Sequence, residues 1–386
     1  MLRQFIKNII DSLILLESYF VKSEKHNKKR VLILRKDTLG DYILFYPTLK
    51  YYREFYKDTE ITLVVTKLFQ GLSPLLSSFD NIIYYDAKKY SSNFFYRRKF
   101  LLDLKRKGFD IVIQTTFSRE ATGDFMMKIT RAKTIVGVNG DLTAQSKTEK
   151  EKGDKFYTDL INIPENIILE IEKNKYVAEY IIKEKVEINF PTINTGLFSN
   201  HDAETIINEN KLENKKYVIV FPGSGTTFKI WPKEKFAQVI DYFIGKGITS
   251  LLCGSNGEKE LIDSILEKVE NKEAVINLVG KTDLQTIMFL LKNSVLYFGS
   301  DTGIAHLSAA IETPTICIMG GGHFGRFFPY GDLNRNKIVF DKDMKCMGDN
   351  WACSKNLKSG ESSPCIQNIK IEDAVKEIDE LLKVYG

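Results

Sequence analysis

The chain has no strong excess of charge of either sign and too few cysteines for a disulfide framework. Its 386 residues carry 55 Lys and Arg against 50 Asp and Glu, a formal net charge of +5. Such a balance is too mild for a protein whose main partner is nucleic acid, but it is compatible with an anionic small molecule or a membrane surface. The five cysteines are an odd number in a long chain. They indicate free thiols and a cytoplasmic protein.

The sequence also lacks a recognisable metal motif. Cys346, Cys353 and Cys365 are spaced C-x6-C-x11-C, which matches no standard zinc pattern, and their segment holds no histidine as a fourth ligand. We expect a structural role for them. Asp341 and Asp343 have the D-x-D form that binds metal in some enzymes, but so short a match arises by chance and lies beyond the last predicted strand. We therefore expect no metal site.

No apolar run is long enough to cross a membrane, although residues 1–30 form an unusual segment. Lys7, Asp11 and Glu17 interrupt its apolar residues, which excludes a membrane span or a signal peptide. Seven Lys and Arg stand against three Asp and Glu there. Helical spacing predicts one apolar stripe, formed by Leu2, Ile6, Ile9, Leu13, Leu16 and Phe20. Two roles stay open for this helix: docking on an anionic membrane, or packing on the body of the protein.

From residue 31 onward, short apolar runs alternate with helical stretches, which is typical of parallel sheets covered on both faces. The predicted strands span residues 31–35, 61–66, 82–86, 111–116 and 134–138, then 217–223, 250–254, 275–280, 295–301 and 313–320. Pro232 suits the first position of a helix, and Thr282 with Gln285 suits a capping box. We predict an N-terminal helix with a basic tail (1–30), two Rossmann-like domains (31–190 and 213–365), a linker (191–212) and a final helix (366–386).

The first chemically informative motif is Arg35-Lys36-Asp37-Thr38-Leu39-Gly40-Asp41, which leads from the first strand into a helix. Gly40 permits a sharp turn, and Asp41 falls at the start of the helix. Asp at this place is commonly a helix cap. It can equally be a carboxylate that takes a proton from an attacking hydroxyl.

The second motif, residues 221–232, follows the first strand of the second half. Its small residues and hydroxyls offer donors to phosphate oxygens, and Lys229 adds a positive charge. Phe228 stands where a dinucleotide G-x-G-x-x-G motif requires its third glycine, and a Walker pattern is absent. An ordinary loop with an exposed lysine is the simpler alternative.

The third motif, residues 299–307, again joins a strand to a helix. The N–H groups near Thr302 and Gly303 lie along the helix dipole and could receive an anion. His306 follows one turn later, where it can approach the same anion or simply pack. Gly320-Gly321-Gly322-His323, after the next strand, allows a backbone to pass close to a ligand.

In this order, the motifs resemble the heptosyltransferases of glycosyltransferase family 9, which act in lipopolysaccharide core assembly. The resemblance runs from residue 31 to the final helix. Its matching parts are L-G-D at 39–41, P-G-S…K-x-W-P at 222–232, L-x-G-K-T at 278–282 and D-T-G-x-x-H at 301–306. Two departures leave the donor's identity open. Residues 320–322 are Gly-Gly-Gly where the family continues Gly-Pro-Thr, and the acidic residue that grips the donor ribose falls near Asn256 or Glu258.

The resemblance implies a GT-B architecture, with two doubly wound domains that face each other across a cleft. It implies an inverting transfer without cofactor or metal, in which an N-terminal domain binds the acceptor and a C-terminal domain the donor. The donor would be ADP-heptose and the acceptor a lipopolysaccharide or lipooligosaccharide core. Asp41 would be the base, and Arg35 and Arg119 would bind the acceptor. The implied donor-binding residues are Ser224, Gly225, Thr226, Thr227, Lys229, Glu258, Thr282, Asp301, Thr302, Gly303 and His306.

Three other functions are alternatives to this one. A transferase of the same fold could use another nucleotide sugar or glycan acceptor. A nucleotide-sugar-binding protein without turnover would keep the donor motifs but lose the motif that contains Asp41. This sequence keeps that motif. A nicotinamide-dependent oxidoreductase needs G-x-G-x-x-G with an acidic residue about twenty positions later, which neither half supplies. We expect a bacterial protein in the cytoplasm, at the inner face of the inner membrane if its acceptor is lipid-linked.

Overall fold

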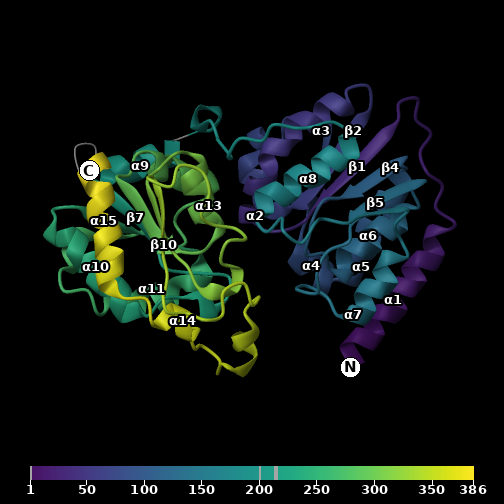
Figure 1. Cartoon of the computed structure of the whole chain (residues 1–386). Helices are drawn as coiled ribbons and strands as arrows, with labels where there is room; N and C mark the ends of the chain where they lie inside the picture. Colours follow the sequence, from purple (N-terminus) through teal and green to yellow (C-terminus); the bar gives the residue numbers. More distant parts are fainter. Residues whose placement is uncertain (1, 200, 213–215) are drawn as a thin grey trace. The chain divides into compact units, whose positions relative to one another are not determined.

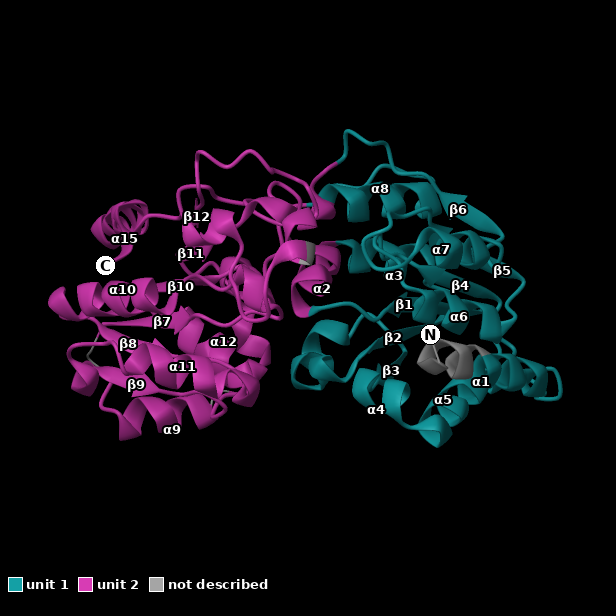
Figure 2. Cartoon of the chain, turned by 90° about the horizontal axis from the view of Figure 1, so that it is seen from below, with its two compact units in different colours: residues 1–38, 48–167, 172–188 teal, residues 39–47, 168–171, 189–386 magenta. Residues whose placement is uncertain are grey.

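The chain divides into two compact units (Figure 2). The computed structural model describes residues 2–199, 201–212 and 216–386. Unit 1 consists of Met1–Thr38, Thr48–Ile167 and Glu172–Ile188, and unit 2 of Leu39–Pro47, Ile168–Ile171 and Asn189–Gly386. Residue 213, the predicted start of the C-terminal domain, lies outside the described residues.

Unit 1 is built on one parallel sheet of six strands. These are β1 (Arg30–Arg35), β2 (Glu60–Thr66), β3 (Asn81–Tyr85), β4 (Ile111–Gln114), β5 (Thr134–Val138) and β6 (Asp159–Ile161), in the order β3-β2-β1-β4-β5-β6. Its helices are α1 (Leu2–Ser18), α3 (Leu49–Phe55), α4 (Ala87–Ser92), α5 (Phe94–Lys107), α6 (Ala121–Thr130) and α7 (Lys147–Asp154). Helix α8 (Glu170–Ile182) begins in a segment of unit 2 and continues in unit 1.

Unit 2 holds a second parallel sheet. Its strands are β7 (Tyr217–Phe221), β8 (Thr249–Leu252), β9 (Val275–Asn277), β10 (Leu296–Ser300), β11 (Thr315–Ile318) and β12 (Asn336–Val339), in the order β12-β11-β10-β7-β8-β9. Its helices are α2 (Leu39–Phe45), α9 (His201–Glu209), α10 (Lys233–Gly245), α11 (Lys259–Leu266), α12 (Leu284–Lys292), α13 (Gly303–Ala310), α14 (Pro364–Gln367) and α15 (Ile371–Tyr385).

The two sheets share one topology. Read from β9, the second sheet runs β9-β8-β7-β10-β11-β12, which repeats the order of the first. Both are doubly wound sheets, so the predicted α/β class is confirmed. In such sheets the order reverses at a switch point, and ligands bind beyond the carboxyl ends of the strands there. The switch points lie between β1 and β4 in unit 1 and between β7 and β10 in unit 2, where Figure 1 shows β7 and β10 side by side.

All ten predicted strands are present, but two were missed and two helix starts were misplaced. The missed strands, β6 and β12, are short edge strands. Pro232 is the residue before α10 rather than its first residue. The predicted capping box at Thr282 is wrong, because Asp283 caps α12 by accepting a hydrogen bond from the N–H of Thr286 at 2.8 Å.

Helix α1 packs on unit 1, against α5, along the edge of the unit (Figure 1). Ile14 is 1% exposed within the apolar core, and Asp11 and Glu17 pair with Arg97 and Arg98 of α5. Packing on the body of the protein is therefore part of the helix's role. Among the described residues, no helix is long and apolar enough to cross a membrane.

Candidate functional site

Helix α2, which carries Asp41, packs on α13 within unit 2. Two glycines make this approach possible. A Cβ on Gly40 would lie 2.6 Å from Cδ2 of His306, and one on Gly303 would lie 2.7 Å from Cβ of Leu39. Both distances are well below an ordinary van der Waals contact. The half-buried Asp41 therefore belongs to the same compact unit as the second and third motifs.

His306 is the residue of α13 that meets Gly40. It is 3% exposed, its ring stacks on Tyr330 with 5.6 Å between centroids, and its Nδ1 lies 3.1 Å from the Tyr330 hydroxyl. Burial lowers the pKa of His306 to about 4, against the attraction of Asp301 and Asp41. The imidazole is therefore neutral near pH 7. If the Tyr330 hydroxyl donates to Nδ1, the remaining N–H is on Nε2, the ring nitrogen nearer to Gly40.

The loop after β7 offers hydroxyls and a cation. Ser224 is half-buried, whereas Thr226 and Thr227 are exposed. Within the described residues, none of these three hydroxyls takes part in a hydrogen bond, so all three are available to a ligand. Lys229 lies at the end of the loop, and its Nζ is 3.0 Å from Oδ2 of Asp301, which follows β10. This ion pair joins the two loops that flank the switch point.

The ion pair is shielded from water: the Lys229 side chain is 17% exposed and that of Asp301 9%. Burial would raise the pKa of Asp301, but the positive charge of Lys229, which also donates a hydrogen bond to this carboxylate, holds the pKa below its usual value. Asp301 therefore stays ionised and fixes the ammonium group of Lys229 beside the start of α13, where Thr302 precedes the first helical residue. The dipole of α13 adds a partial positive charge there.

Trp351 is a prominent residue of this region that the motifs did not reveal. Its ring lies 5.3 Å from Nζ of Lys229, and it occupies the space beside Gly320 and Gly322 that side chains there would need. The glycine loop therefore accommodates an indole, whereas the sequence suggested close passage of a ligand. Trp351 is 6% exposed and has a left-handed backbone at φ 60°, in an irregular segment that carries no periodic signal.

The structure separates the two candidates for the ribose-binding residue. Glu258 accepts a hydrogen bond from the backbone N–H of Ser255 at 2.6 Å, and its other carboxylate oxygen lies against Gly223 at the end of β7. Asn256 points instead at Gly280. Glu258 is therefore the one that lies beside the loop of the second motif. Thr282 is half-buried and follows Gly280 in the loop before α12.

The two arginines expected at the acceptor are completely buried in unit 1. Arg35 pairs with Asp37 at 3.1 Å and donates to Thr115 and to Asn174. These contacts support a structural role for Arg35, and we do not propose it as an acceptor ligand.

Arg119 is in a similar position. It pairs with Asp124 at 3.1 Å and with Asp154, and its guanidinium lies 4.6 Å from the Tyr157 ring centroid. Burial raises the pKa of the Asp124 carboxyl, against the attraction of Arg119. Arg119 is completely buried among these partners, so we do not propose it as an acceptor ligand either.

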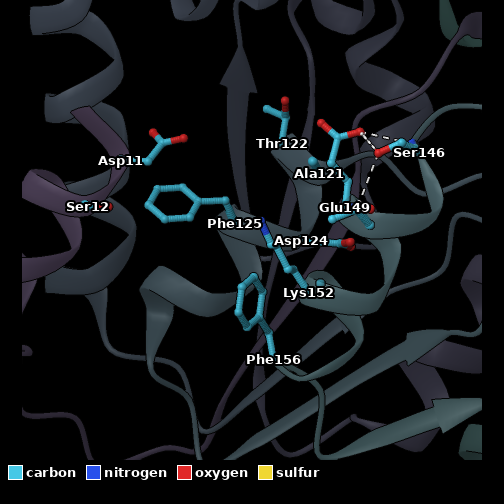
Figure 3. Close-up of a pocket in the computed structure, with 12 residues that line it drawn as sticks. Asp11, Ser12, Ala121, Thr122, Asp124, Phe125, Ser146, Glu149, Lys152 and Phe156 are labelled. Atoms are coloured by element: carbon cyan, nitrogen blue, oxygen red, sulfur yellow. Dashed lines mark hydrogen bonds between the residues drawn. The ribbon is translucent and has the colours of Figure 1, made fainter. Parts of the chain in front are cut away.

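Unit 1 also contains a pocket of about 620 Å³ between α1, α6 and α7 (Figure 3). Phe125 and Phe156 lie on one side, and the capping pair Ser146 and Glu149 lies on another. The walls are mixed in charge and mostly apolar. Nothing in the arrangement selects a particular ligand.

The C-terminal cysteines surround the glycine loop. The N–H of Gly321 donates to Sγ of Cys365 at 3.4 Å, and a side chain on Gly321 would meet Cys346. Cys346, Cys353 and Cys365 are free thiols. In the part of the chain that the structure describes, no three His, Cys, Asp or Glu side chains are grouped to hold a metal ion.

Comparisons with known proteins identify relatives of this chain in sequence and in fold. The model of glycosyltransferase family 9 (heptosyltransferase) matches residues 97–355. Lipopolysaccharide heptosyltransferase 1 of Campylobacter coli is 24% identical over 364 residues, which cover 91% of this chain and 98% of the relative. The structure of ADP-heptose lipopolysaccharide heptosyltransferase II of Escherichia coli superposes with a TM-score of 0.68 at 16% identity, over 92% of this chain and 98% of that one. The iron-containing dodecameric glycosyltransferase TibC of Escherichia coli gives a TM-score of 0.54 at 12% identity, over 95% of this chain and 78% of the other.

Two doubly wound sheets, each with its motifs at the switch point, make the fold that of a GT-B glycosyltransferase. The chain belongs to glycosyltransferase family 9.

Proposed function

We propose that this glycosyltransferase moves a heptose from ADP-heptose to a lipopolysaccharide or lipooligosaccharide core acceptor, with inversion at the anomeric carbon. The observation that carries the proposal is the packing of α2 on α13, which puts Asp41 in one unit with Lys229 and the start of α13. The names of the relatives support the sugar and the acceptor. We propose that unit 2 binds the donor and that unit 1 supplies acceptor contacts.

In the proposed reaction, the Asp41 carboxylate takes the proton of the acceptor hydroxyl as its oxygen attacks the anomeric carbon. A bond forms between that oxygen and the carbon while the bond from the carbon to the diphosphate breaks. ADP departs with the electron pair. Lys229, the N–H groups at the start of α13, and the hydroxyls of Ser224, Thr226 and Thr227 stabilise the negative charge that develops on the diphosphate.

We propose that no divalent metal takes part. The support is the half-buried cation Lys229 beside the dipole of an eight-residue helix, two groups that stabilise a diphosphate without a metal. Asp301, the acidic residue that directly precedes Thr302, is already bound to Lys229. The iron of TibC is a property of that protein, and a chelator experiment tests whether this chain needs a metal.

We propose that Glu258 binds the ribose hydroxyls of the donor, while Asp301 and His306 position the groups that contact it. A carboxylate beside the loop after β7 is the arrangement that a doubly wound site uses for a ribose. For location, we propose the cytoplasmic face of a bacterial inner membrane, because a lipid-linked core acceptor lies in a membrane.

The test is a transfer assay with ADP-heptose and a lipid-free core acceptor, preceded by a thermal-shift screen of nucleotide sugars. ADP-heptose should raise the melting temperature most and should yield a product of inverted configuration. Preference for another nucleotide sugar would leave the proposed reaction type standing but would show that the donor is not ADP-heptose. Strong donor binding without any transfer would instead favour a nucleotide-sugar-binding protein.

A further inference from the structure

The N-terminal helix α1 has two apolar faces, and only one of them is covered. Its inner face includes Ile14, which is 1% exposed, and is fixed by the ion pairs of Asp11 and Glu17 with α5. The opposite face is the stripe that the sequence predicts. Ile9 is 45% exposed, Leu13 58% and Leu16 59%. The side chains of Leu2 and Ile6 lie outside the described part of the stripe.

Exposed aromatic residues follow this uncovered face along the chain and also occur on α5. Phe20, just beyond the helix, is 81% exposed, and Tyr19 beside it is 60% exposed, with the guanidinium of Arg131 3.6 Å from its ring centroid. Phe95 is 78% exposed in the first turn of α5, the helix on which α1 lies. So many large apolar side chains open to water on one pair of helices indicate a surface that is covered during function.

The surroundings of this face are strongly basic. Residues 9–30 and 94–107 together hold eleven Lys and Arg against four Asp and Glu. This local excess of +7 is larger than the net charge of +5 of the whole chain. Lys22, Lys25, Lys28 and Lys29 are exposed, and none of them forms an ion pair among the described residues. The acidic residues Asp11, Glu17 and Asp103 are engaged with arginines of α5.

We propose that the outer face of α1, with the basic segment 22–30 after it, is a docking surface for an anionic phospholipid bilayer. Apolar side chains beside a cluster of lysines match the two parts of such a membrane, its acyl region and its charged headgroups. A second copy of this chain fits less well, because it would bring two strongly basic faces together. The purpose of this docking surface rests on the proposed function, in which the acceptor lies in a membrane. Binding to vesicles requires no sugar transfer, so the docking surface and the proposed function can be refuted separately.

Substitutions on the outer face of α1 test the docking surface better than deletion of the helix does. The helix also contributes Ile14, Asp11 and Glu17 to the body of unit 1, so its deletion would disturb the fold. The variant exchanges Leu13, Leu16 and Phe20 for serine. Its matched control exchanges Leu142, Leu197 and Leu333, which are exposed to 54%, 53% and 56% on other parts of the chain. A further variant exchanges Lys22, Lys25, Lys28 and Lys29 for glutamine. Melting temperatures verify that all variants fold.

Binding is measured by co-sedimentation with vesicles of phosphatidylcholine, with and without phosphatidylglycerol. The stripe variant should bind phosphatidylglycerol vesicles at least about tenfold more weakly than the parent chain, since each apolar side chain stabilises the bound state. The control variant should bind like the parent. The lysine variant should lose on the order of fivefold per lysine on anionic vesicles at low salt, and much less at high salt.

Equal binding of the stripe variant and the parent would overturn the proposal. So would a parent chain that does not bind anionic vesicles. A stripe variant that turns a dimer into a monomer, with vesicle binding unchanged, would show that a second copy covers this face. Transfer to a lipid-free acceptor should be unchanged in the folded stripe variant, and its loss would show that this face serves transfer itself and would overturn the docking surface. Absence of transfer by the parent chain would instead count against the proposed function.

Discussion

Gly40→Ala perturbs the packing of α2 on α13 with a single methyl group. The new Cβ would lie 2.6 Å from Cδ2 of His306, where an ordinary contact needs at least 3.4 Å. His306 has little freedom to retreat, because it is 3% exposed, hydrogen-bonded to Tyr330 at 3.1 Å and packed 4.8 Å from the ring of Phe328. One of the two helices must therefore move by nearly an ångström.

The structure allows a magnitude for this change. Overpacking of a tight interface typically costs about 1–3 kcal/mol of the free energy of unfolding. The effect on turnover should be larger, because Asp41 is the next residue and a displacement of about 1 Å can lower a rate by about 100-fold. Donor affinity should change less than turnover, since Lys229 and Glu258 lie outside α2 and α13.

Chemical denaturation, a steady-state transfer assay and calorimetry with ADP measure the three quantities. Gly245→Ala is the control, because a Cβ at Gly245, at the end of α10, would meet nothing within 4 Å. It should leave turnover unchanged and stability equal or slightly higher. If Gly40→Ala kept the stability and turnover of the parent, the close packing of α2 on α13 would be refuted.

Three further predictions concern the donor site. Lys229→Ala should weaken ADP binding and turnover together, because the ammonium group interacts with the diphosphate before and during bond cleavage; unchanged ADP affinity in calorimetry would place Lys229 outside the site. EDTA should leave turnover unchanged, and loss of activity that Mg²⁺ or Mn²⁺ restores would contradict the metal-independent proposal. Because burial depresses the pKa of His306 to about 4 from about 6.5, its contribution to stability is complete above pH 6.5 and is lost as the pH falls from there towards 4. His306→Gln should therefore flatten the decline in melting temperature over that range, and an unchanged slope would argue against a buried neutral imidazole.

Much of the fold could be predicted because its strands are buried on both faces. Continuous apolar runs such as Val31–Leu34 and Tyr217–Val220 are a strong signal, and the motifs at their carboxyl ends follow directly. The edge strands β6 and β12 contain only three and four residues and mix polar with apolar positions, so no run distinguishes them from loops. The cap of α12 was misplaced by one residue because Thr282 and Asp283 are both good capping residues in sequence.

The site was predictable where its chemistry is local and unpredictable where it depends on tertiary packing. Lys229 and Thr302 stand in recognisable strand–helix loops, but nothing local reveals that Asp301 binds Lys229 or that Gly40 meets His306. The same limit applies to the two arginines: the resemblance implied an acceptor contact, and the sequence could not reveal that Asn174 and Asp154 are among the residues that enclose them. For α1, the periodicity found the stripe but could not reveal that a second face, including Ile14, packs on α5.

The central claim is that Asp41 is the base of a glycosyl transfer, and single-turnover transfer from ADP-heptose by Asp41→Asn tests it most directly. Asparagine keeps the size of the side chain but cannot accept the proton, so the rate should fall by at least about 100-fold, the usual contribution of general base catalysis. ADP affinity and melting temperature should stay close to those of the parent. Asp343→Asn is the control, because this carboxylate belongs to the discounted D-x-D segment, and it should transfer at the parental rate. A near-parental rate for the folded Asp41→Asn variant would contradict the account.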